Sequence, residues 1–496
     1  MLFIESRTLD YRVDGATRVL VLESLQREKG VIPLIHSSRL RCFELALQQT
    51  GEAAGERQIK EMENLIAAWT ESEENTTFVA GDVFCFDDFV LFLTFGGTRE
   101  GESPRTHAGV IYGAETAEPL RKLDSFCRDV RDALAFARSA VDGGAKGGKG
   151  SSEPGFTVEW RRGKPRVPAG FARFITNQDI DSLYTAVRKE TRIERQRAAM
   201  LLEDTYSRLY LRRVREAHTE GCATKLLTTG KIETSEASID KLFDVGLIRH
   251  EVLVSCRKTG HALFHLPTPD SLAVVTVSEA TCSECGAPVA DEKIEEVITP
   301  TDLATMLLED GAWLVNRLYS ILRKIGIPES EIAIGPVSEG GEAHIMANVC
   351  GESFLFVLRD GDLTTAAARR VIDMEIETEA PHVVIVATGE IHDEGRVRLF
   401  DHARRRMRSG NEIEVMIVDG TDTAAVELRH AFERVSQRVI AEQLSKLDAS
   451  AGLSVSRVVI SRFELMRKIG SMKELAESSI EVTDLSLIPK TKYAVF

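Results

Sequence analysis

Three cysteines in the middle of the chain have the residue type and spacing of metal ligands. Cys282 and Cys285 form a C-x-x-C turn with a glycine directly after it, so both thiolates and the turn backbone can face one tetrahedral ion. Cys256 precedes them across a strand-like stretch and supplies a third thiolate. The pattern predicts a structural zinc site, which stabilises a fold and leaves no coordination position for a substrate.

The fourth ligand of this site has to come from a histidine. Thr259 stands where a second C-x-x-C would place another cysteine, so His261 is the expected ligand and His265 a less favoured one. Two other interpretations stay open, namely a ribbon held by packing alone and a redox-active cysteine pair. The predicted metal ligands are Cys256, His261, Cys282 and Cys285.

Charged residues also gather at the ends of two predicted strands in the second half of the chain. Residues 342–349 and 353–358 are expected to be strands; Glu342 begins the first, and Arg359 and Asp360 follow the second. Carboxylate oxygens are the ligands that Mg²⁺ prefers, and a bound Mg²⁺ can activate an attacking water. These residues could therefore support metal-dependent hydrolysis.

The elements that position these residues resemble a known nuclease core. A helix is expected over 364–376 and an apolar strand over 382–387, which gives the order strand, strand, helix, strand. This order resembles the restriction-endonuclease-like superfamily over residues 301–420. Members with the PD-(D/E)xK signature carry an acid on the first strand and E-x-K on the second. The acids hold Mg²⁺, and the lysine orients or activates the water.

The signature itself is altered in this chain. The acid position falls on His344, and the E-x-K positions fall on Val357, Leu358 and Arg359. Val357 has no ligand atom, and Arg359 keeps the positive charge of the lysine but is too basic to transfer a proton. The resemblance therefore implies a fold that has kept its shape and lost its chemistry.

Two alternatives to this interpretation remain. In the first, the domain is an active Mg²⁺-dependent nuclease whose relocated ligands are Glu342, Asp360 and Asp362, with Arg359 in place of the lysine. In the second, it is an unrelated α/β domain.

The densest basic cluster follows the central strands. It consists of four arginines at the end of a predicted helix, Arg404, Arg405, Arg406 and Arg408. Because phosphate contacts dominate nucleic-acid affinity, this is where nucleic acid is expected to bind. The formal net charge of −15 argues against binding by the whole surface.

Two helical segments lie before the cysteines. Residues 179–218 keep a helical pattern far longer than an average helix, which suits a spacer or a homo-oligomer contact. Residues 222–255 resemble a winged helix, but its recognition helix carries Glu236, Asp240 and Asp244. Acids in that position repel phosphate, so a protein-docking or spacing role is at least as well supported as DNA reading.

Composition places the chain among ordinary globular proteins. The hydrophobic fraction is 43% and the charged fraction 28%. No apolar run approaches the ~20 residues of a membrane span, and the first residues lack signal-peptide order, so a cytoplasmic protein without membrane contact is expected.

The expected fold class is multidomain α/β and α+β. A restriction-endonuclease-like core is expected in the C-terminal half, a winged helix and a zinc ribbon in the middle, and an α+β domain at the N-terminus. The expected segments are 1–142 (N-terminal domain), 143–155 (flexible linker), 156–221 (helical spacer), 222–255 (winged helix), 256–290 (zinc ribbon), 301–420 (nuclease-like) and 421–496 (C-terminal helix and appendix).

This combination resembles prokaryotic DNA-processing and antiviral defence proteins. It implies a non-catalytic or weakly catalytic component that binds nucleic acid or a protein partner within an assembly. The alternatives are an active Mg²⁺-dependent nuclease and a winged-helix transcription regulator.

Overall fold

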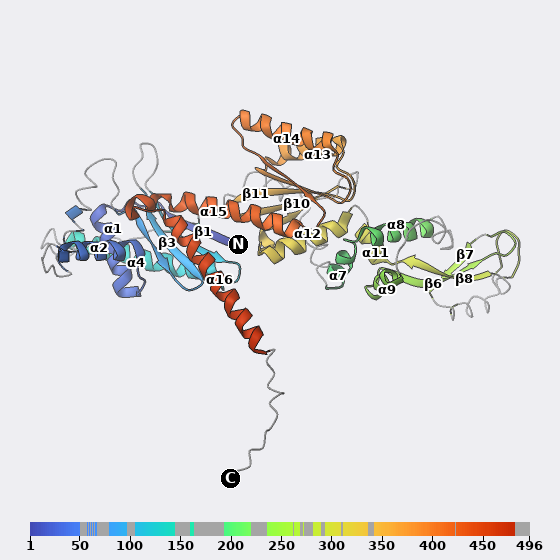
Figure 1. The fold of residues 1–496 in the computed structure, drawn as a ribbon, viewed down its shortest axis with the longest axis horizontal. Coiled ribbons are helices and arrows are strands. Elements are labelled where there is room, and N and C mark those ends of the chain that lie inside the picture. Colours follow the sequence, from blue (N-terminus) through green and yellow to red (C-terminus); the bar gives the residue numbers. More distant parts are fainter. Residues whose placement is uncertain are drawn as a thin grey trace, which may run out of the picture. The chain divides into compact units, whose positions relative to one another are not determined.

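A computed structural model describes the chain in two compact units (Figure 1). The first unit comprises Met1–Pro165 and Glu433–Phe496, and the second Arg166–Phe432. The described residues are 1–49, 57, 59, 61, 63, 65–66, 79–96, 105–143, 159–162, 193–219, 236–260, 262–267, 271, 281–288, 293–308, 311–335, 342–421 and 423–481. The protein is thus a mixed α/β protein with several sheets, as expected. In these residues, no helix is both long and apolar enough to cross a membrane.

The first unit is built on a five-stranded antiparallel sheet of order β2-β3-β4-β1-β5. The strands are β1 (Leu2–Leu9), β2 (Gly81–Cys85), β3 (Phe89–Phe95), β4 (Thr106–Gly113) and β5 (Arg161–Arg162). β3 is buried along its whole length, which fits its run of Phe, Val and Leu residues.

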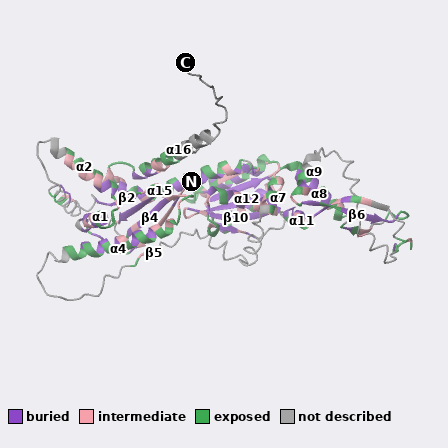
Figure 2. Cartoon of the chain, turned by 90° about the horizontal axis from the view of Figure 1, so that it is seen from below, coloured by how far each residue is buried: buried purple, intermediate pink, exposed green. Residues whose placement is uncertain are grey.

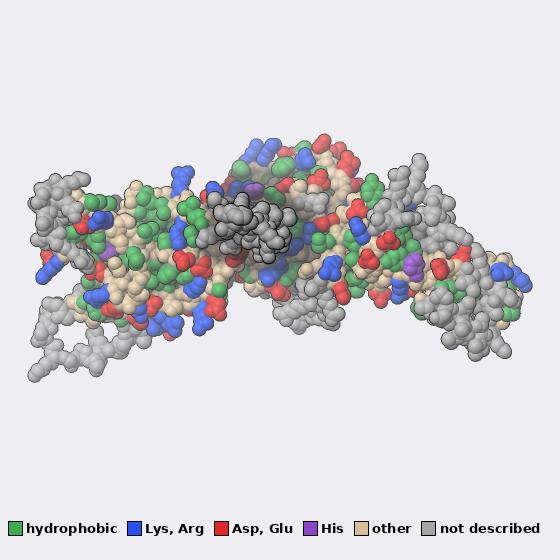
Figure 3. Space-filling view, turned by 60° about the horizontal axis from the view of Figure 1, so that its bottom comes forward, with side chains coloured by type: hydrophobic (Ala, Val, Ile, Leu, Met, Phe, Trp, Pro, Cys, Tyr) green, Lys and Arg blue, Asp and Glu red, His purple; other side chains and the backbone are tan. Residues whose placement is uncertain are grey.

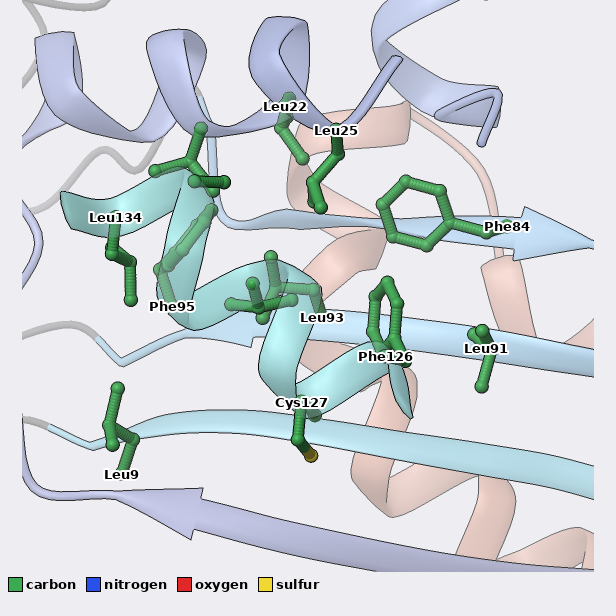
Figure 4. Close-up of a cluster of buried hydrophobic side chains, with 14 of the residues drawn as sticks. Leu9, Leu22, Leu25, Phe84, Leu91, Leu93, Phe95, Phe126, Cys127 and Leu134 are labelled. Carbon is green, nitrogen blue, oxygen red and sulfur yellow. The ribbon is translucent and has the colours of Figure 1, made fainter. Parts of the chain in front are cut away.

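Helices cover both faces of this sheet. Helices α1 (Gly15–Lys29) and α4 (Pro119–Gly143) pack on one face, where Leu22 and Phe126 join a large apolar cluster (Figure 4). On the other face lie α2 (Leu34–Gln49), the later part of α15 (Ala424–Ala451) and α16 (Val455–Glu481). Figure 2 shows the buried residues concentrated on the strands. The C-terminal helices are therefore part of the packing of this unit.

A buried carboxylate caps helix α2. Asp82 on β2 accepts hydrogen bonds from the backbone N–H groups of Ile35 (2.8 Å) and His36 (2.7 Å). Burial raises the pKa of Asp82 to about 6. Beside it, Nδ1 of His36 lies 3.0 Å from Oε1 of Glu63. Burial alone would raise the pKa of Glu63, but His36 and Arg39 bring it below its ordinary value.

The second unit contains a five-stranded mixed sheet of order β13-β12-β11-β10-β9. The strands are β9 (Ile332–Ile334), β10 (Glu342–Val349), β11 (Glu352–Arg359), β12 (His382–Ala387) and β13 (Glu414–Asp419). The first three are antiparallel neighbours, and the last two run parallel to β11. The two strands and the apolar strand expected at 342–349, 353–358 and 382–387 are thus confirmed.

Helices flank this sheet on both sides (Figure 1). Helix α12 (Ala312–Ile325) precedes β9, while α13 (Thr365–Thr378) and α14 (Asp393–Arg408) follow β11 and β12. Thr364 caps α13 because its hydroxyl accepts from the N–H of Ala367. The helix expected over 364–376 is therefore confirmed.

A smaller sheet of order β7-β6-β8 lies in the same unit. It consists of β6 (Ile248–Ser255), β7 (Ala262–Leu266) and β8 (Lys293–Pro300). Helices α9 (Glu236–Asp244) and α11 (Asp302–Leu308) accompany this sheet. The short 3-10 helix η4 (Glu329–Glu331) lies instead beside the larger sheet, next to β10. Helix α9 and strand β6 lie within the segment expected to be a winged helix, 222–255. The first part of that segment, residues 222–235, lies outside the described residues, as does the predicted linker from residue 144 to residue 155.

One prediction about a helix is wrong. The pattern over 179–218 is not one helix in its described part, because α7 (Ile193–Leu201) ends and α8 (Thr205–Thr219) begins anew. Asp204 causes the break by accepting hydrogen bonds from the N–H (3.0 Å) and hydroxyl (2.7 Å) of Ser207. Residues 455–460, a run rich in β-branched side chains, form the start of α16, and Val455 and Val459 both enter the core from one helix face.

Candidate functional site

The charged residues expected at the ends of two strands lie on the hairpin of β10 and β11. Cys350 and Gly351 make the turn with positive φ angles of 53° and 89°. The resulting register places Glu342 opposite Arg359 and His344 opposite Val357. His344 and Val357 are both buried, and the valine supplies no ligand atom at the position expected for a metal-binding acid.

Glu342 is a buried counter-ion for two arginines. Its side chain is 1% exposed, and Oε1 accepts from Nη1 of Arg359 at 2.7 Å. Arg370 on α13 adds two hydrogen bonds, from Nε to Oε2 at 3.0 Å and from Nη2 to Oε1 at 2.5 Å. This pairing raises the pKa of Arg370 above its ordinary value. The carboxylate of Glu342 therefore faces positive charge on both oxygens.

Asp360 is held separately by neighbours from three other elements. Its Oδ2 accepts from Nε1 of Trp313 at 2.8 Å and from Nη2 of Arg212 at 2.5 Å, and its Oδ1 accepts from the hydroxyl of Thr388 at 2.8 Å. Arg208 stacks over the ring of Trp313 at 4.8 Å. Only 7% of the Asp360 side chain is exposed. Both of its oxygens thus join α8, α12 and the strand ends.

Asp362, the third acid, is exposed and its side chain binds the backbone of the loop after β12. Its Oδ1 accepts from the backbone N–H of Glu390 at 2.8 Å. The three acids at this end of the sheet therefore have three different sets of partners. Across the described part of the chain, the one group of three or more Cys, His, Asp or Glu residues able to hold a metal is the three cysteines.

The arginine cluster of α14 divides by burial. Arg406 is partly buried and its Nη2 donates to Oε1 of Glu375 at 3.1 Å, while Nε2 of His402 lies 2.7 Å from Oε2 of the same glutamate. Arg405 and Arg408 are exposed, and Arg404 is 74% exposed with only a long contact to Asp401 at 3.5 Å. Arg406 thus fixes α14 to α13, and the other three arginines are available to a ligand. Over the face seen in Figure 3, basic and acidic side chains are intermixed.

The three cysteines meet at the end of the smaller sheet. Cys256 follows β6, and Cys282 and Cys285 lie in the turn between β7 and β8. All three Sγ atoms lie within 4.8 Å of one another, and those of Cys256 and Cys285 are 3.4 Å apart. The C-x-x-C turn closes with the N–H of Gly286 donating to the carbonyl of Cys282 at 2.8 Å. The cluster could therefore hold a metal ion.

Thr259, which stands where a fourth cysteine would be expected, donates hydrogen bonds to Cys256. Hydrogen bonds from the side chain and backbone of Thr259 lower the pKa of Cys256, which favours the thiolate form that metals bind. His261 lies outside the described residues. His265 is exposed, and its Nδ1 lies 3.7 Å from Oε2 of Glu251, so the structure does not bring it into the cluster.

Several residues of this site were not predicted from the sequence. They are the partners of the two buried acids, namely Arg208, Arg212, Trp313, Arg370 and Thr388. A weak signal existed for one pair, because Arg208 and Arg212 are four residues apart and share one face of a helix. No local pattern connects the other partners to the acids.

None of the three comparisons with known proteins gave a match. No family model, no curated protein and no solved structure matches this chain.

Proposed function

We propose that the protein is a non-catalytic nucleic-acid-binding component of a prokaryotic defence or DNA-processing assembly, built on a restriction-endonuclease-like core. The observation that carries this proposal is the pairing of Glu342 with Arg359 and Arg370. A Mg²⁺ ion at this carboxylate would have to displace two guanidinium groups, and the one acid of the facing strand, Glu352, lies at its opposite end beside His382. Cleavage would therefore be left to a protein partner.

Nucleic acid would bind along α14. Arg404, Arg405 and Arg408 present exposed guanidinium groups in the last turns of this helix. Each can contact a phosphate oxygen, and the anchored Arg406 holds the helix in place beneath them. Binding of this kind reads the backbone and carries little sequence preference.

The cysteine cluster would hold one structural Zn²⁺ ion. Three sulfur ligands in a closed turn match the donor set of structural zinc sites, and His261 is the proposed fourth ligand. Bound zinc would join the ends of β6 and the β7–β8 connection, and so would stabilise the small sheet beside α9. Its role in this proposal is architectural.

A binding titration with fluorescent single-stranded and duplex DNA tests the proposed function. The variant Arg404/Arg405/Arg408→Ala should weaken binding by about 100-fold or more, since three phosphate contacts of roughly 1 kcal/mol each are lost. The charge-matched control is Arg121/Arg213/Arg457→Ala, which removes three exposed arginines from other helices. Equal weakening by both variants, or no binding by the wild type, would contradict the role of α14.

A further inference from the structure

The first unit contains a pocket of about 300 Å³ beside its main helix. Three arginines and a tryptophan line it together with two acids: Arg7, Arg128, Arg131, Trp160, Asp124 and Glu159. Basic groups next to an indole ring form a combination suited to a ligand that carries both negative charge and a flat ring. The volume matches the lower end of small-molecule sites.

Regular structure positions these side chains. On α4, Asp124, Cys127, Arg128 and Arg131 have the spacing i, i+3, i+4 and i+7, which places them on one stripe of the helix. Arg7 comes from β1, whose edge neighbour β5 pairs at this point, with Arg7 opposite Arg162. Glu159 and Trp160 directly precede β5, so sheet pairing holds the indole next to the helix stripe.

Donor groups in the pocket are poorly used by the protein itself. Arg7 is 7% exposed, yet its Nη2 reaches only Oδ1 of Asp124 at 3.3 Å and its Nη1 only the carbonyl of Ser6 at 3.3 Å. Arg128 is exposed and has no ion-pair partner in the described residues, and Arg131 has only a distant contact to Asp132 at 3.7 Å. Within the same residues, the buried indole Nε1 of Trp160 has no hydrogen-bond acceptor. The buried Nε1 of Trp160 is costly to leave without an acceptor, and the two exposed arginines are free to bind an anion.

We propose that this pocket binds a nucleotide, with its phosphate on Arg128 and Arg131 and its base against the indole of Trp160. Arg7 supplies a buried guanidinium behind the phosphate. Asp124 and Glu159 are positioned to accept hydrogen bonds from ribose hydroxyl or base amino groups, and they limit the formal charge of the pocket to +1. The nucleotide can be free or can belong to a single strand, because both offer one phosphate and one flat base.

The pocket is a binding site and not a reaction centre. Its one nucleophile, Cys127, is buried, and burial raises the pKa of its thiol to about 12, so the thiol stays protonated at neutral pH. The pocket lies in a different unit from α14. Loss of nucleotide binding in the pocket would therefore leave DNA binding by α14 untouched, and the two proposals can be tested separately.

The test is isothermal titration of the full chain with AMP, with inorganic phosphate and with a ten-residue oligo(dA). The variants are Arg128→Gln, Arg128/Arg131→Gln and Trp160→Leu, and Arg121→Gln on the same helix but outside the pocket is the control. Circular dichroism confirms that each variant is folded. We expect AMP or oligo(dA) to bind at least about 10-fold more tightly than phosphate, because base–aromatic stacking adds roughly 1–3 kcal/mol.

The two sources of the nucleotide give different patterns. Binding of AMP shows a free nucleotide site, and binding of oligo(dA) alone shows a single-strand site. In either case Arg128→Gln and Trp160→Leu should each weaken binding about 10-fold, and the double arginine variant more, while Arg121→Gln has no effect. No binding of AMP or oligo(dA), or binding unchanged by Trp160→Leu and by the double arginine variant, overturns the inference.

Discussion

Glu342 and Arg359 lie directly opposite each other across β10 and β11, with Nη1 of the arginine 2.7 Å from Oε1 of the glutamate. Arg370 on α13 donates two further hydrogen bonds to the same carboxylate. The carboxylate of Glu342 therefore serves to hold β10, β11 and α13 together through two arginines.

Replacing Glu342 should destabilise the second unit. Glu342→Gln removes the negative charge that Arg359 and Arg370 share, and leaves the partly buried guanidinium group of Arg359 and the more exposed one of Arg370 facing an amide. We expect a loss of about 2–4 kcal/mol in the free energy of unfolding, measured by urea denaturation. Glu377→Gln, an exposed change on the same helix as Arg370, should cost less than about 0.5 kcal/mol. A variant as stable as the wild type would argue that Glu342 is strained, as catalytic acids often are.

The hydrogen bonds around Asp360 predict that replacing this aspartate lowers the free energy of unfolding more than replacing its partner Arg212. Asp360→Ala leaves the fully buried indole of Trp313 and the hydroxyl of Thr388 without their acceptor, so a loss of about 3 kcal/mol is expected. Arg212→Ala should cost clearly less, because 40% of that side chain is exposed and Asp360 keeps its other donors. Thermal unfolding of both variants checks the order. The reverse order would mean that Asp360 is held mainly by charge.

Metal content tests the cysteine cluster. The purified chain should contain about one zinc ion, since three thiolates and a histidine form a closed tetrahedral site. Cys282→Ser should remove most of it, whereas Cys85→Ser, which changes a cysteine outside the cluster, should leave it unchanged. Elemental analysis of the three proteins gives the result. Zinc-free wild-type protein with a native circular dichroism spectrum would show a ribbon held by packing alone.

Burial of Asp82 predicts a pH dependence in the first unit. Its folded pKa of about 6 lies above the value near 4 of an unfolded aspartate, so the folded state holds this proton more tightly. The contribution to stability is therefore complete below about pH 4 and is lost as the pH rises through 6. Relative to Asp82→Asn, wild-type stability should fall by about 2–3 kcal/mol between pH 4 and pH 7. Urea denaturation at four pH values checks this, and a constant difference between the two proteins would refute it.

The sequence allowed prediction of the central elements of the second unit's main sheet, though not of strand β9, because local signals there agree. Strands 342–349 and 353–358 are apolar runs separated by Cys350 and Gly351 at a turn, and Thr364 marks a helix start. Prediction failed where distant packing decides. The β-branched run after Ser454 favours a strand locally. In the structure it is helical, because Val455 and Val459 then lie on one helix face and pack against the sheet of the first unit.

The candidate site was predicted only in part for the same reason. Glu342, Asp360 and Arg359 were recognisable because they stand at strand ends, and the C-x-x-C turn has a local signature. Whether an acid binds a metal or an arginine depends on residues brought in by other helices. Arg370 and Arg212 come from α13 and α8, and Trp313 from α12, at separations that no local pattern encodes.

A cleavage assay tests the central claim most directly. The purified chain is incubated with supercoiled plasmid and with single-stranded DNA in Mg²⁺ and in Mn²⁺, beside Glu342→Ala and Asp360→Ala. If the carboxylates serve the fold, none of the three proteins cuts DNA with either ion. Cation-dependent cleavage by the wild type that disappears in both variants would contradict the claim and establish a working nuclease.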